Sequence, residues 1–190
     1  MADRKQELPP SLRPVLAFLN TVDVELATDD LAGGPSTVSA WLAAGGLISD
    51  GVVVTPAEYR TALALRSGLR ALALLNNGGP ADEAALEEGR RALRRVPLIA
   101  ALTDNGDTAL VPGATRPVLA ALGRIAAGYV LATASGQWQR LRRCPAGDCA
   151  WVFWDSSPKG GRRWCTMRVC GNRAKARTFA ERQRQRVETI

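Results

Sequence analysis

The chain contains two cysteine pairs of the form C-x4-C, Cys144-Pro-Ala-Gly-Asp-Cys149 and Cys165-Thr-Met-Arg-Val-Cys170, separated by fifteen residues. Four thiolates can hold Zn²⁺ at tetrahedral corners about 2.3 Å from the metal, provided that each pair folds back on itself. Pro145 and Gly147 permit such a turn in the first pair. Positions five apart on an α-helix point about 140° apart and cannot chelate, so we expect Cys165 to precede a helix and Cys170 to lie in its first turn. The spacing therefore predicts a small metal-folded module with these four cysteines as zinc ligands.

The alternatives to zinc are an iron–sulfur site, a pair of disulfides or four unrelated core cysteines. A reducing cytosol disfavours structural disulfides, and the clustering of all four cysteines within 27 residues disfavours chance. Because the 190 residues include no histidine, the sequence excludes imidazole zinc ligands and histidine-dependent nucleophilic catalysis. With all four positions filled by protein the site is closed, so we expect a structural Zn²⁺ and no enzyme activity.

Charge divides the chain at Ser135. Residues 1–135 carry 12 basic and 14 acidic side chains, a net charge of −2, whereas residues 136–190 carry 13 basic and 4 acidic ones, a net charge of +9. All four cysteines and four of the five tryptophans lie in the second segment. The sequence therefore predicts two chemically different modules in one chain.

Apolar periodicity and turn residues predict a mainly helical first module. Thr55-Pro-Ala-Glu58 has the pattern of a capping box with proline at the first helical position, and Asp104-Asn-Gly106 favours a hairpin turn. In the tail, the aromatic run 151–154 favours a strand. The expected elements are helices at about 14–20, 38–44, 56–75, 82–95 and 117–134, a hairpin joining 98–102 to 108–111, the strand 151–154, and a terminal helix from about residue 166.

The terminal helix is strongly basic. On a helical wheel, one cationic row holds Arg173 and another holds Lys175, while Ala176 and Phe179 belong to an apolar stripe between them that we expect to pack on the zinc module. Two rows of cations allow a helix to lie in a groove with phosphates on each side, and six phosphate contacts give a slope of about −5 in log K against log[salt]. The predicted nucleic-acid contacts are Arg162, Arg163, Arg173, Lys175, Arg177, Arg182, Arg184 and Arg186. A solvated surface helix is the alternative.

Two further features of the tail have alternative interpretations. Its tryptophans and Phe153 can stack unpaired bases, or form the small core of the metal module; alternation along a strand places Trp151 and Phe153 on one face and Val152 and Trp154 on the other. Asn172 can cap the helix, hydrogen-bond within the cysteine turn, or read a base, and the first two roles are the simpler interpretation.

A polar group follows the first apolar helix. Asn20, Thr21, Arg66 and Arg70 are candidate residues for a pocket that binds a small ligand in the first module. The simpler account gives Asn20 and Thr21 a helix-end role and pairs the two arginines with acids such as Asp23.

The tail resembles a known family. The run from Trp164 to Arg177 is similar to the CGNR zinc finger, named for the motif at Cys170-Gly-Asn-Arg173, and Cys144, Cys149 and Phe153 fit the same finger. The first module resembles the ABATE domain that usually precedes this finger, through residues 16–23, 41–42 and 65–72. The resemblance implies a stress-induced transcription regulator that binds DNA through positive charge.

The expected fold is mainly α with a small β-hairpin, followed by a treble-clef-like four-cysteine zinc finger built of a β-hairpin and a C-terminal helix. Residues 1–10 are expected to be a flexible lead-in, 11–135 an ABATE-like helical domain acting as sensor or dimerisation module, and 137–187 the finger. We expect a Cys144→Ser change to release the metal and unfold the tail without melting residues 1–135.

The expected function is that of a zinc-dependent, DNA-binding transcription regulator of the stress-response type. The alternatives are an RNA-binding or ribosome-associated protein and a zinc-scaffolded protein that binds a ligand or a partner. A charged N-terminus with no apolar segment before Pro9 predicts a cytoplasmic protein, and we expect no membrane partner. A homodimer is compatible with this organisation.

Overall fold

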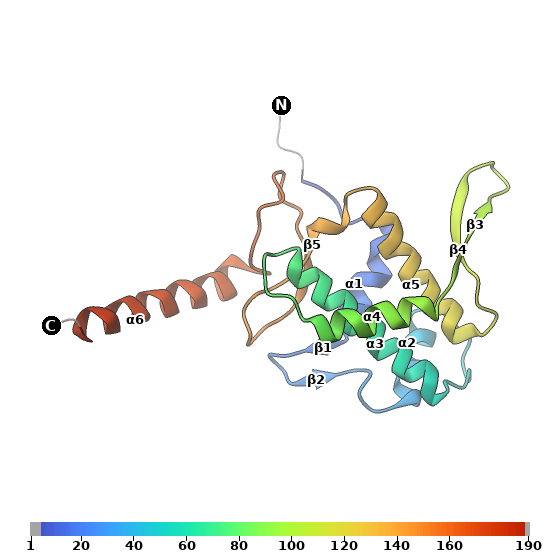
Figure 1. Ribbon diagram of the computed structural model, residues 1–190, viewed down its shortest axis with the longest axis horizontal. Coiled ribbons are helices and arrows are strands. Elements are labelled where there is room, and N and C mark those ends of the chain that lie inside the picture. Colours follow the sequence, from blue (N-terminus) through green and yellow to red (C-terminus); the bar gives the residue numbers. More distant parts are fainter. Residues whose placement is uncertain (1–4, 189–190) are drawn as a thin grey trace.

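The computed structural model describes residues 5–188, with side chains through residue 185 (Figure 1). The helices and strands run in the order η1 (Pro10–Leu12), α1 (Arg13–Leu19), β1 (Val22–Asp23), β2 (Thr28–Asp29), α2 (Pro35–Ala44), α3 (Pro56–Leu75), α4 (Glu83–Arg94), β3 (Leu98–Leu102), β4 (Thr108–Pro112), α5 (Pro117–Ala134), η2 (Trp138–Arg140), β5 (Leu141–Arg143), β6 (Val152–Trp154), η3 (Met167–Gly171) and α6 (Asn172–Glu188). The predicted fold class is confirmed: helices dominate, and a four-cysteine module with a hairpin and a helix follows them.

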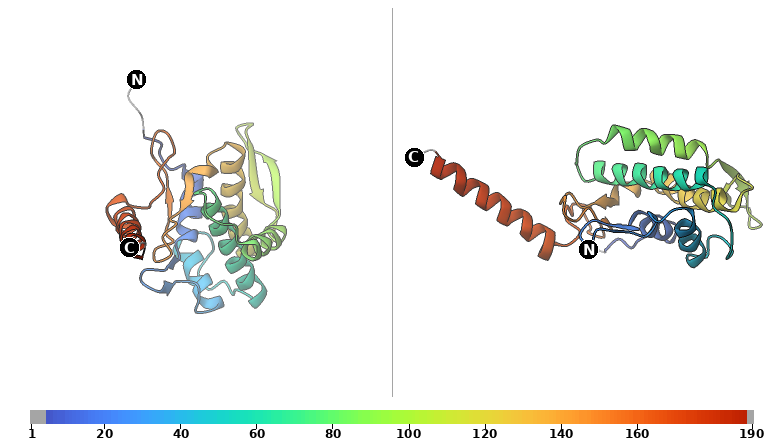
Figure 2. Two further views of the ribbon diagram at one scale, coloured as in Figure 1. Left: turned by 60° about the vertical axis from the view of Figure 1, so that its left-hand side comes forward. Right: turned by 90° about the horizontal axis from the view of Figure 1, so that it is seen from below.

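Helices α1, α3 and α5 enclose the main core, and α4 covers α3 (Figure 2). Val15, Leu65, Leu69, Leu122 and Ile125 are at most 1% exposed there. Their spacing of three and four along each helix places them on one face, which is the pattern that buries an amphipathic helix.

The start of α3 is fixed as the sequence predicts. The Thr55 side chain accepts a hydrogen bond from the Glu58 backbone N–H, and the Glu58 carboxylate accepts one from the Thr55 backbone N–H, so the capping box is complete. The buried Glu58 carboxylate also accepts two hydrogen bonds from Arg116, the residue before α5, at 2.6 and 2.9 Å. One carboxylate therefore caps α3 and links it to α5.

Replacing this carboxylate gives a pH-dependent prediction. The hydrogen bonds from Arg116 lower the pKa of Glu58 to about 2. A carboxyl group whose folded pKa lies below its unfolded value stabilises the fold above about pH 5, and this contribution is lost as the pH falls towards 2. A Glu58→Gln variant is therefore expected to be less stable than the parent by about 1–2 kcal/mol at pH 7, after allowance for the exposed Arg116 partner. In urea unfolding between pH 7 and pH 2, the difference in free energy of unfolding between parent and variant should shrink. A difference that grows on acidification contradicts a stabilising role for the ionised Glu58 carboxylate.

Helix α5 is, among the described residues, the one helix long and apolar enough to cross a membrane, and half of it is buried within the protein. It packs against α1, α2, α3 and the strand β4. The helix therefore has the contacts of a core element of this fold.

The hairpin β3–β4 is antiparallel with Leu102 opposite Thr108, and Gly106 in its loop has a φ of 80°, as the predicted turn requires. The short pair β1–β2 was not expected, because strands of two residues leave no periodic signal. Helix α2 begins at Pro35 after Gly34, one turn earlier than predicted. Its first residue is a proline, whose fixed φ suits the first helical position.

Two expectations about separate parts of the chain differ from the structure. Within the described residues, the expected lead-in is bound: the Gln6 N–H donates to the Ser156 carbonyl, and the Trp154 indole N–H donates to the Gln6 carbonyl. The core enclosed by the helices also includes Trp138, Leu141 and Val152 from the C-terminal segment. Because these three side chains belong to the helical core, we no longer expect the tail to unfold independently of residues 1–135.

Candidate metal centre and nucleic-acid surface

The first cysteine pair lies in the turn between β5 and β6. The Cys144 N–H donates to the Trp151 carbonyl at 2.8 Å, which closes the hairpin. Ala146 accepts hydrogen bonds from the N–H groups of Cys149 and Ala150 at 3.0 and 2.9 Å. Ala150 has a φ of 51°, a left-handed conformation that turns the chain back towards the strand. The pair therefore folds back on itself, as chelation requires.

The second pair follows the predicted arrangement. Cys165 lies before the helix, and the Thr166 hydroxyl accepts a hydrogen bond from the Val169 N–H as an N-cap. Cys170 lies in η3, a single π-helical turn, and the Gly171 N–H donates to the Thr166 carbonyl at 3.2 Å. This hydrogen bond joins residues five apart, as in a π-helix. Cys170 in the turn lies next to Cys165, which precedes it, with 3.5 Å between their Sγ atoms.

The four sulfur atoms converge on one point. All of them lie within 4.8 Å of one another, and the Sγ atoms of Cys149 and Cys170 each lie 3.5 Å from that of Cys165. Four sulfurs at tetrahedral corners about 2.3 Å from Zn²⁺ are separated by about 3.8 Å. The cysteines are free thiols, and a disulfide needs a sulfur–sulfur distance of about 2 Å. The donor set therefore fits a four-thiolate metal ion and not two disulfides.

Burial raises the pKa of Cys165 to about 11 and also raises that of Cys170. Zinc takes thiolates, so it displaces the protons of these thiols when it binds. A bound Zn²⁺ supplies a cross-link between the hairpin and the start of α6. The module's own apolar core is small: Ala146 and Phe153 pack with the cysteines, and Trp164 and Val169 pack against them.

Gly171 of the CGNR-like motif lies close to two side chains. A Cβ at this position would lie 2.4 Å from the sulfur of Met167, a flexible and half-exposed side chain that can move aside, and 3.3 Å from the Trp164 ring. Asn172 donates from Nδ2 to the Arg168 carbonyl at 3.1 Å, so its side chain binds the turn locally.

Strand β6 joins two cores through its alternating faces. Val152 and Trp154 pack into the helical core, whereas Phe153 packs against the cysteines, as the predicted alternation requires. Trp138 is 5% exposed, and its ring contacts that of Tyr129 edge-on. These aromatic side chains have packing roles, while Trp151 remains 38% exposed.

The candidate ligand residues of the first module bind the protein itself. Asn20 donates to the Val152 carbonyl and accepts from the Val152 N–H, at 2.8 and 2.9 Å, and Thr21 donates to the Phe18 carbonyl. The side chain of Asn20 thus pairs with the backbone of β6, which lies 132 residues away in the sequence.

The two candidate arginines also have internal partners. Arg66 pairs with both oxygens of Asp29, at 2.6 and 2.7 Å, where the sequence had suggested Asp23. Burial alone would raise the pKa of Asp29, but the hydrogen bonds from Arg66 and the Leu31 N–H, together with the positive charges of Arg66 and Arg70, outweigh it and lower this pKa. Arg70 donates to the Leu19 carbonyl and, at 3.0 Å, to that of Ala150, the residue after Cys149. The salt-bridge account therefore holds for Arg66 and the helix-end account for Thr21. Asn20 and Arg70 instead bind backbone groups of the C-terminal segment.

Sequence reasoning missed a second set of contacts at the end of α3. The side-chain amide of Asn76 donates to the carbonyls of Trp138 and Leu141, and that of Asn77 donates to those of Arg143 and Arg163, all at 2.7–2.9 Å. Two adjacent asparagines before two glycines predict a helix stop. That signal gave no indication of the backbone groups that the side chains hold.

The loop after β6 is organised by Asp155, which is fully buried. Its carboxylate accepts hydrogen bonds from the Ser157 N–H and hydroxyl and from the Arg162 N–H. The Arg162 guanidinium lies 5.0 Å from the centre of the Phe153 ring and donates to the Trp164 carbonyl. Arg162, a predicted nucleic-acid contact, therefore binds groups within the finger itself.

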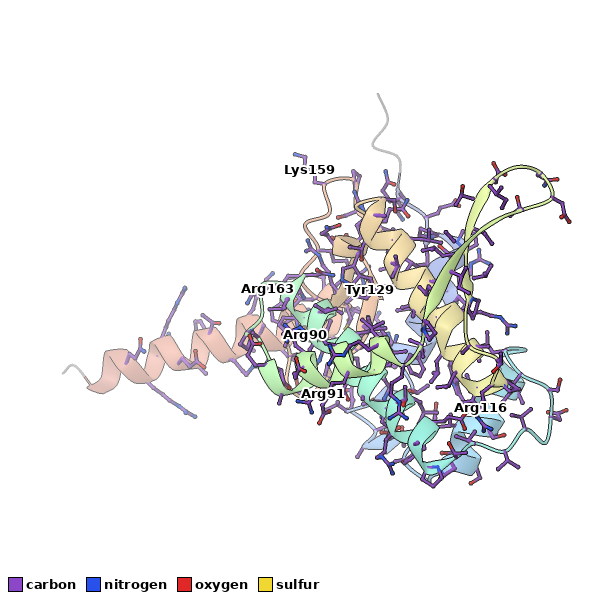
Figure 3. The ribbon with its side chains drawn as sticks, turned by 45° about the vertical axis from the view of Figure 1, so that its right-hand side comes forward. Arg90, Arg91, Arg116, Tyr129, Lys159 and Arg163 are labelled. Atoms are coloured by element: carbon purple, nitrogen blue, oxygen red, sulfur yellow. The ribbon has the colours of Figure 1, made fainter. Side chains whose placement is uncertain are left out.

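Arg163 remains exposed, with its guanidinium 5.4 Å from the centre of the Trp164 ring (Figure 3). It lies on the same loop and stays a candidate nucleic-acid contact. Arg168, an exposed cation in η3, was missing from the predicted set.

The two cationic rows of α6 have different environments. Arg173 binds Glu25 of the helical domain at 2.7 Å, and both Arg173 and Arg177 approach Asp148 of the first cysteine turn, at 3.5 and 3.7 Å. These acids were not counted as partners in the sequence. Lys175 and Arg182 of the other row are exposed, as is Arg184 at the far end of the Arg173 row, and the described part of the chain offers these three no ion-pair partner. Arg186 lies outside the residues whose side chains are described.

The apolar stripe of α6 does not pack on the finger as expected. Figure 1 and the right-hand view of Figure 2 show α6 extending away from the body of the protein, and Phe179 is 65% exposed. Phe179 instead borders a groove together with Met167 and Trp164 of the finger, and Lys175 and Arg182 line the same groove. The unpaired cationic row therefore lies beside exposed aromatic and thioether groups.

Comparison with known families identifies both parts of the chain. Residues 12–136 match ABATE, described as "Putative stress-induced transcription regulator", and residues 140–183 match the CGNR zinc finger. The families are of the zinc-finger and regulator types and are not enzyme families. No curated protein matches the chain.

Proposed function

Because the chain belongs to the ABATE family and carries a CGNR zinc finger, we propose that it is a cytoplasmic transcription regulator of the stress-response type. In this proposal Zn²⁺ binds Cys144, Cys149, Cys165 and Cys170, and DNA binds the exposed cations of α6. A thiolate centre of this kind suits a reducing compartment.

The observation that carries the DNA proposal is the unpaired cationic row of a projecting helix. Lys175 and Arg182 lie seven residues apart on one face, and neither has an acidic partner among the described side chains. A helix that projects from the protein can enter a groove of DNA, and its unpaired cations can replace the counterions of the DNA phosphates. Arg173 and Arg177 hold the base of the same helix against Glu25 and Asp148. We assign them to positioning α6 rather than to binding phosphate.

The test is a charge reversal with a matched control. A Lys175→Glu, Arg182→Glu double variant is expected to bind a short labelled duplex about a hundredfold more weakly at low salt, with a shallower salt dependence. The control variant, Arg60→Glu with Arg95→Glu, makes the same charge change at two exposed positions of the helical domain. Fluorescence anisotropy of the zinc-loaded proteins measures both. Equal losses of duplex affinity in the two variants would show a general charge effect and would contradict the assignment of DNA binding to α6.

The groove beside the row favours a second candidate, recognition of unpaired bases in RNA or single-stranded DNA. Phe179 is 65% exposed and Met167 is 51% exposed, next to Lys175. Exposed aromatic groups beside cations are typical of proteins that stack unpaired bases. Competition between duplex DNA, single strands and structured RNA separates the candidates, and a Phe179→Ala variant should weaken only binding that depends on stacking.

A further inference from the structure

Helices α3 and α4 enclose an apolar cavity of about 230 Å³ against α5. The two helices touch at Gly68 and Gly89, where a Cβ on either glycine would lie only 2.5–2.7 Å from the Cα of the other. Leucines on both sides of this contact line the space, and Leu72 and Leu93 remain partly exposed although they face apolar neighbours. Because protein interiors are normally close-packed, an apolar space of this size is unusual.

Two polar side chains line the cavity. They are Arg90 of α4 and Tyr129 of α5, both labelled in Figure 3. The Arg90 side chain is 56% exposed. The Tyr129 hydroxyl has no hydrogen-bond partner within the described part of the chain. Arg90 shares the single carboxylate of Glu87 with Arg91 and Arg94, so this edge keeps a net positive charge.

From this geometry we propose that the cavity binds a small molecule with an apolar body and one anionic head, such as an aromatic or short aliphatic carboxylate. An apolar cavity of about 150 Å³ holds a benzene ring, so the space here accommodates a ring with a few methylene groups. The leucines receive the apolar body. Arg90 receives the carboxylate and the Tyr129 hydroxyl donates to it. The proposal goes beyond DNA binding and does not depend on it.

The position of the cavity links it to the finger. Leu75 lines it and is followed by Asn76, which holds the carbonyls of Trp138 and Leu141. Tyr129 lines it and packs edge-on against Trp138, with ring centres 4.7 Å apart. A ligand in the cavity would therefore contact Leu75 and Tyr129, the immediate neighbours of Asn76 and Trp138.

Calorimetric titration of the full zinc-loaded chain with 3-phenylpropionate tests the site, with the neutral amide of the same acid as the matched ligand. We expect the carboxylate to bind with a Kd of about 0.1–1 mM and the amide at least tenfold more weakly. The Arg90→Gln variant should lose the same affinity for the carboxylate. Arg60 is an exposed arginine on α3, and the Arg60→Gln variant should lose none. Leu72→Trp should abolish binding by filling the cavity; if circular dichroism shows that variant unfolded, Leu75→Trp at the cavity edge makes the same test.

Three outcomes would overturn the proposal. The first is no saturable binding of the carboxylate below about 10 mM. The second is unchanged binding by a folded cavity-filling variant. Equal affinity for acid and amide would overturn the assignment of Arg90 as the anion-binding group. Because no nucleic acid is present in the titration, each result is independent of DNA binding.

Discussion

A Cys170→Ser variant is expected to lose the metal and to destabilise the whole chain, helical domain included. Serine is a poor zinc ligand, and three remaining thiolates do not complete the tetrahedral site. In a module of this size, the free energy of metal binding supplies much of the stability of the folded state. When the metal is lost, we therefore expect the segment that it cross-links to open. Trp138, Leu141 and Val152 of that segment lie in the helical core. Withdrawing them is expected to cost about 4 kcal/mol or more, at about 1.5–3 kcal/mol for each large apolar side chain.

The matched control for this variant is Arg168→Ser, an exposed position in the same turn. Zinc content and hydrogen exchange of α1 and α5 are the two measurements. We expect the cysteine variant to lose zinc and to exchange faster in both helices, and the control to change neither. Metal loss with unchanged exchange in α1 and α5 would show that the finger and the helical domain are independent, which contradicts the shared core.

An Arg70→Met variant is expected to lower the free energy of unfolding by about 3 kcal/mol. Arg70 is 7% exposed and donates to the carbonyls of Leu19 and Ala150. Methionine fills similar space but donates no hydrogen bond, so both carbonyls lose their partner. Burial lowers the pKa of Arg70 to about 10, which leaves it charged at neutral pH. Because Ala150 follows Cys149, the variant should also bind zinc about tenfold or more weakly, as when groups that orient a metal ligand are removed.

Urea unfolding and zinc competition with a chelator measure the two effects. Arg60→Met makes the same substitution on the same helix at an exposed position, and it should change each quantity little. Equal stability of the two variants would mean that Arg70 does not hold the finger. A destabilised Arg70→Met protein with unchanged zinc affinity would limit its role to the helical domain.

Local signals in the sequence predict the parts of the fold that depend on neighbouring residues. Thr55 and Glu58 form their capping box because its partners lie three residues apart, and Gly106 gives the hairpin its turn. The C-x4-C spacing likewise brings together the two sulfurs of each pair, since each turn is short. These features need no knowledge of how the helices pack.

The contacts between the two modules could not be predicted in the same way. Asn20 reaches Val152 over 132 residues, and Arg70 reaches Ala150 over 80. An asparagine after a helix, or two arginines one turn apart, have the same local pattern whether they cap, pair or bind a ligand. The pairing of Arg173 with Glu25 also depends on this docking. Net charge alone therefore overestimates how many cations of α6 are free.

The salt dependence of duplex binding by the zinc-loaded chain tests the central claim most directly. Among the described side chains of α6, the unpaired cations are Lys175, Arg182 and Arg184. Three phosphate contacts predict a slope of about −3 in log K against log[salt], compared with about −5 for six. Fluorescence anisotropy from low salt to physiological salt gives this slope. Binding with a slope near −3 is the predicted result; no binding at low salt, or an affinity that does not change with salt, would contradict the account.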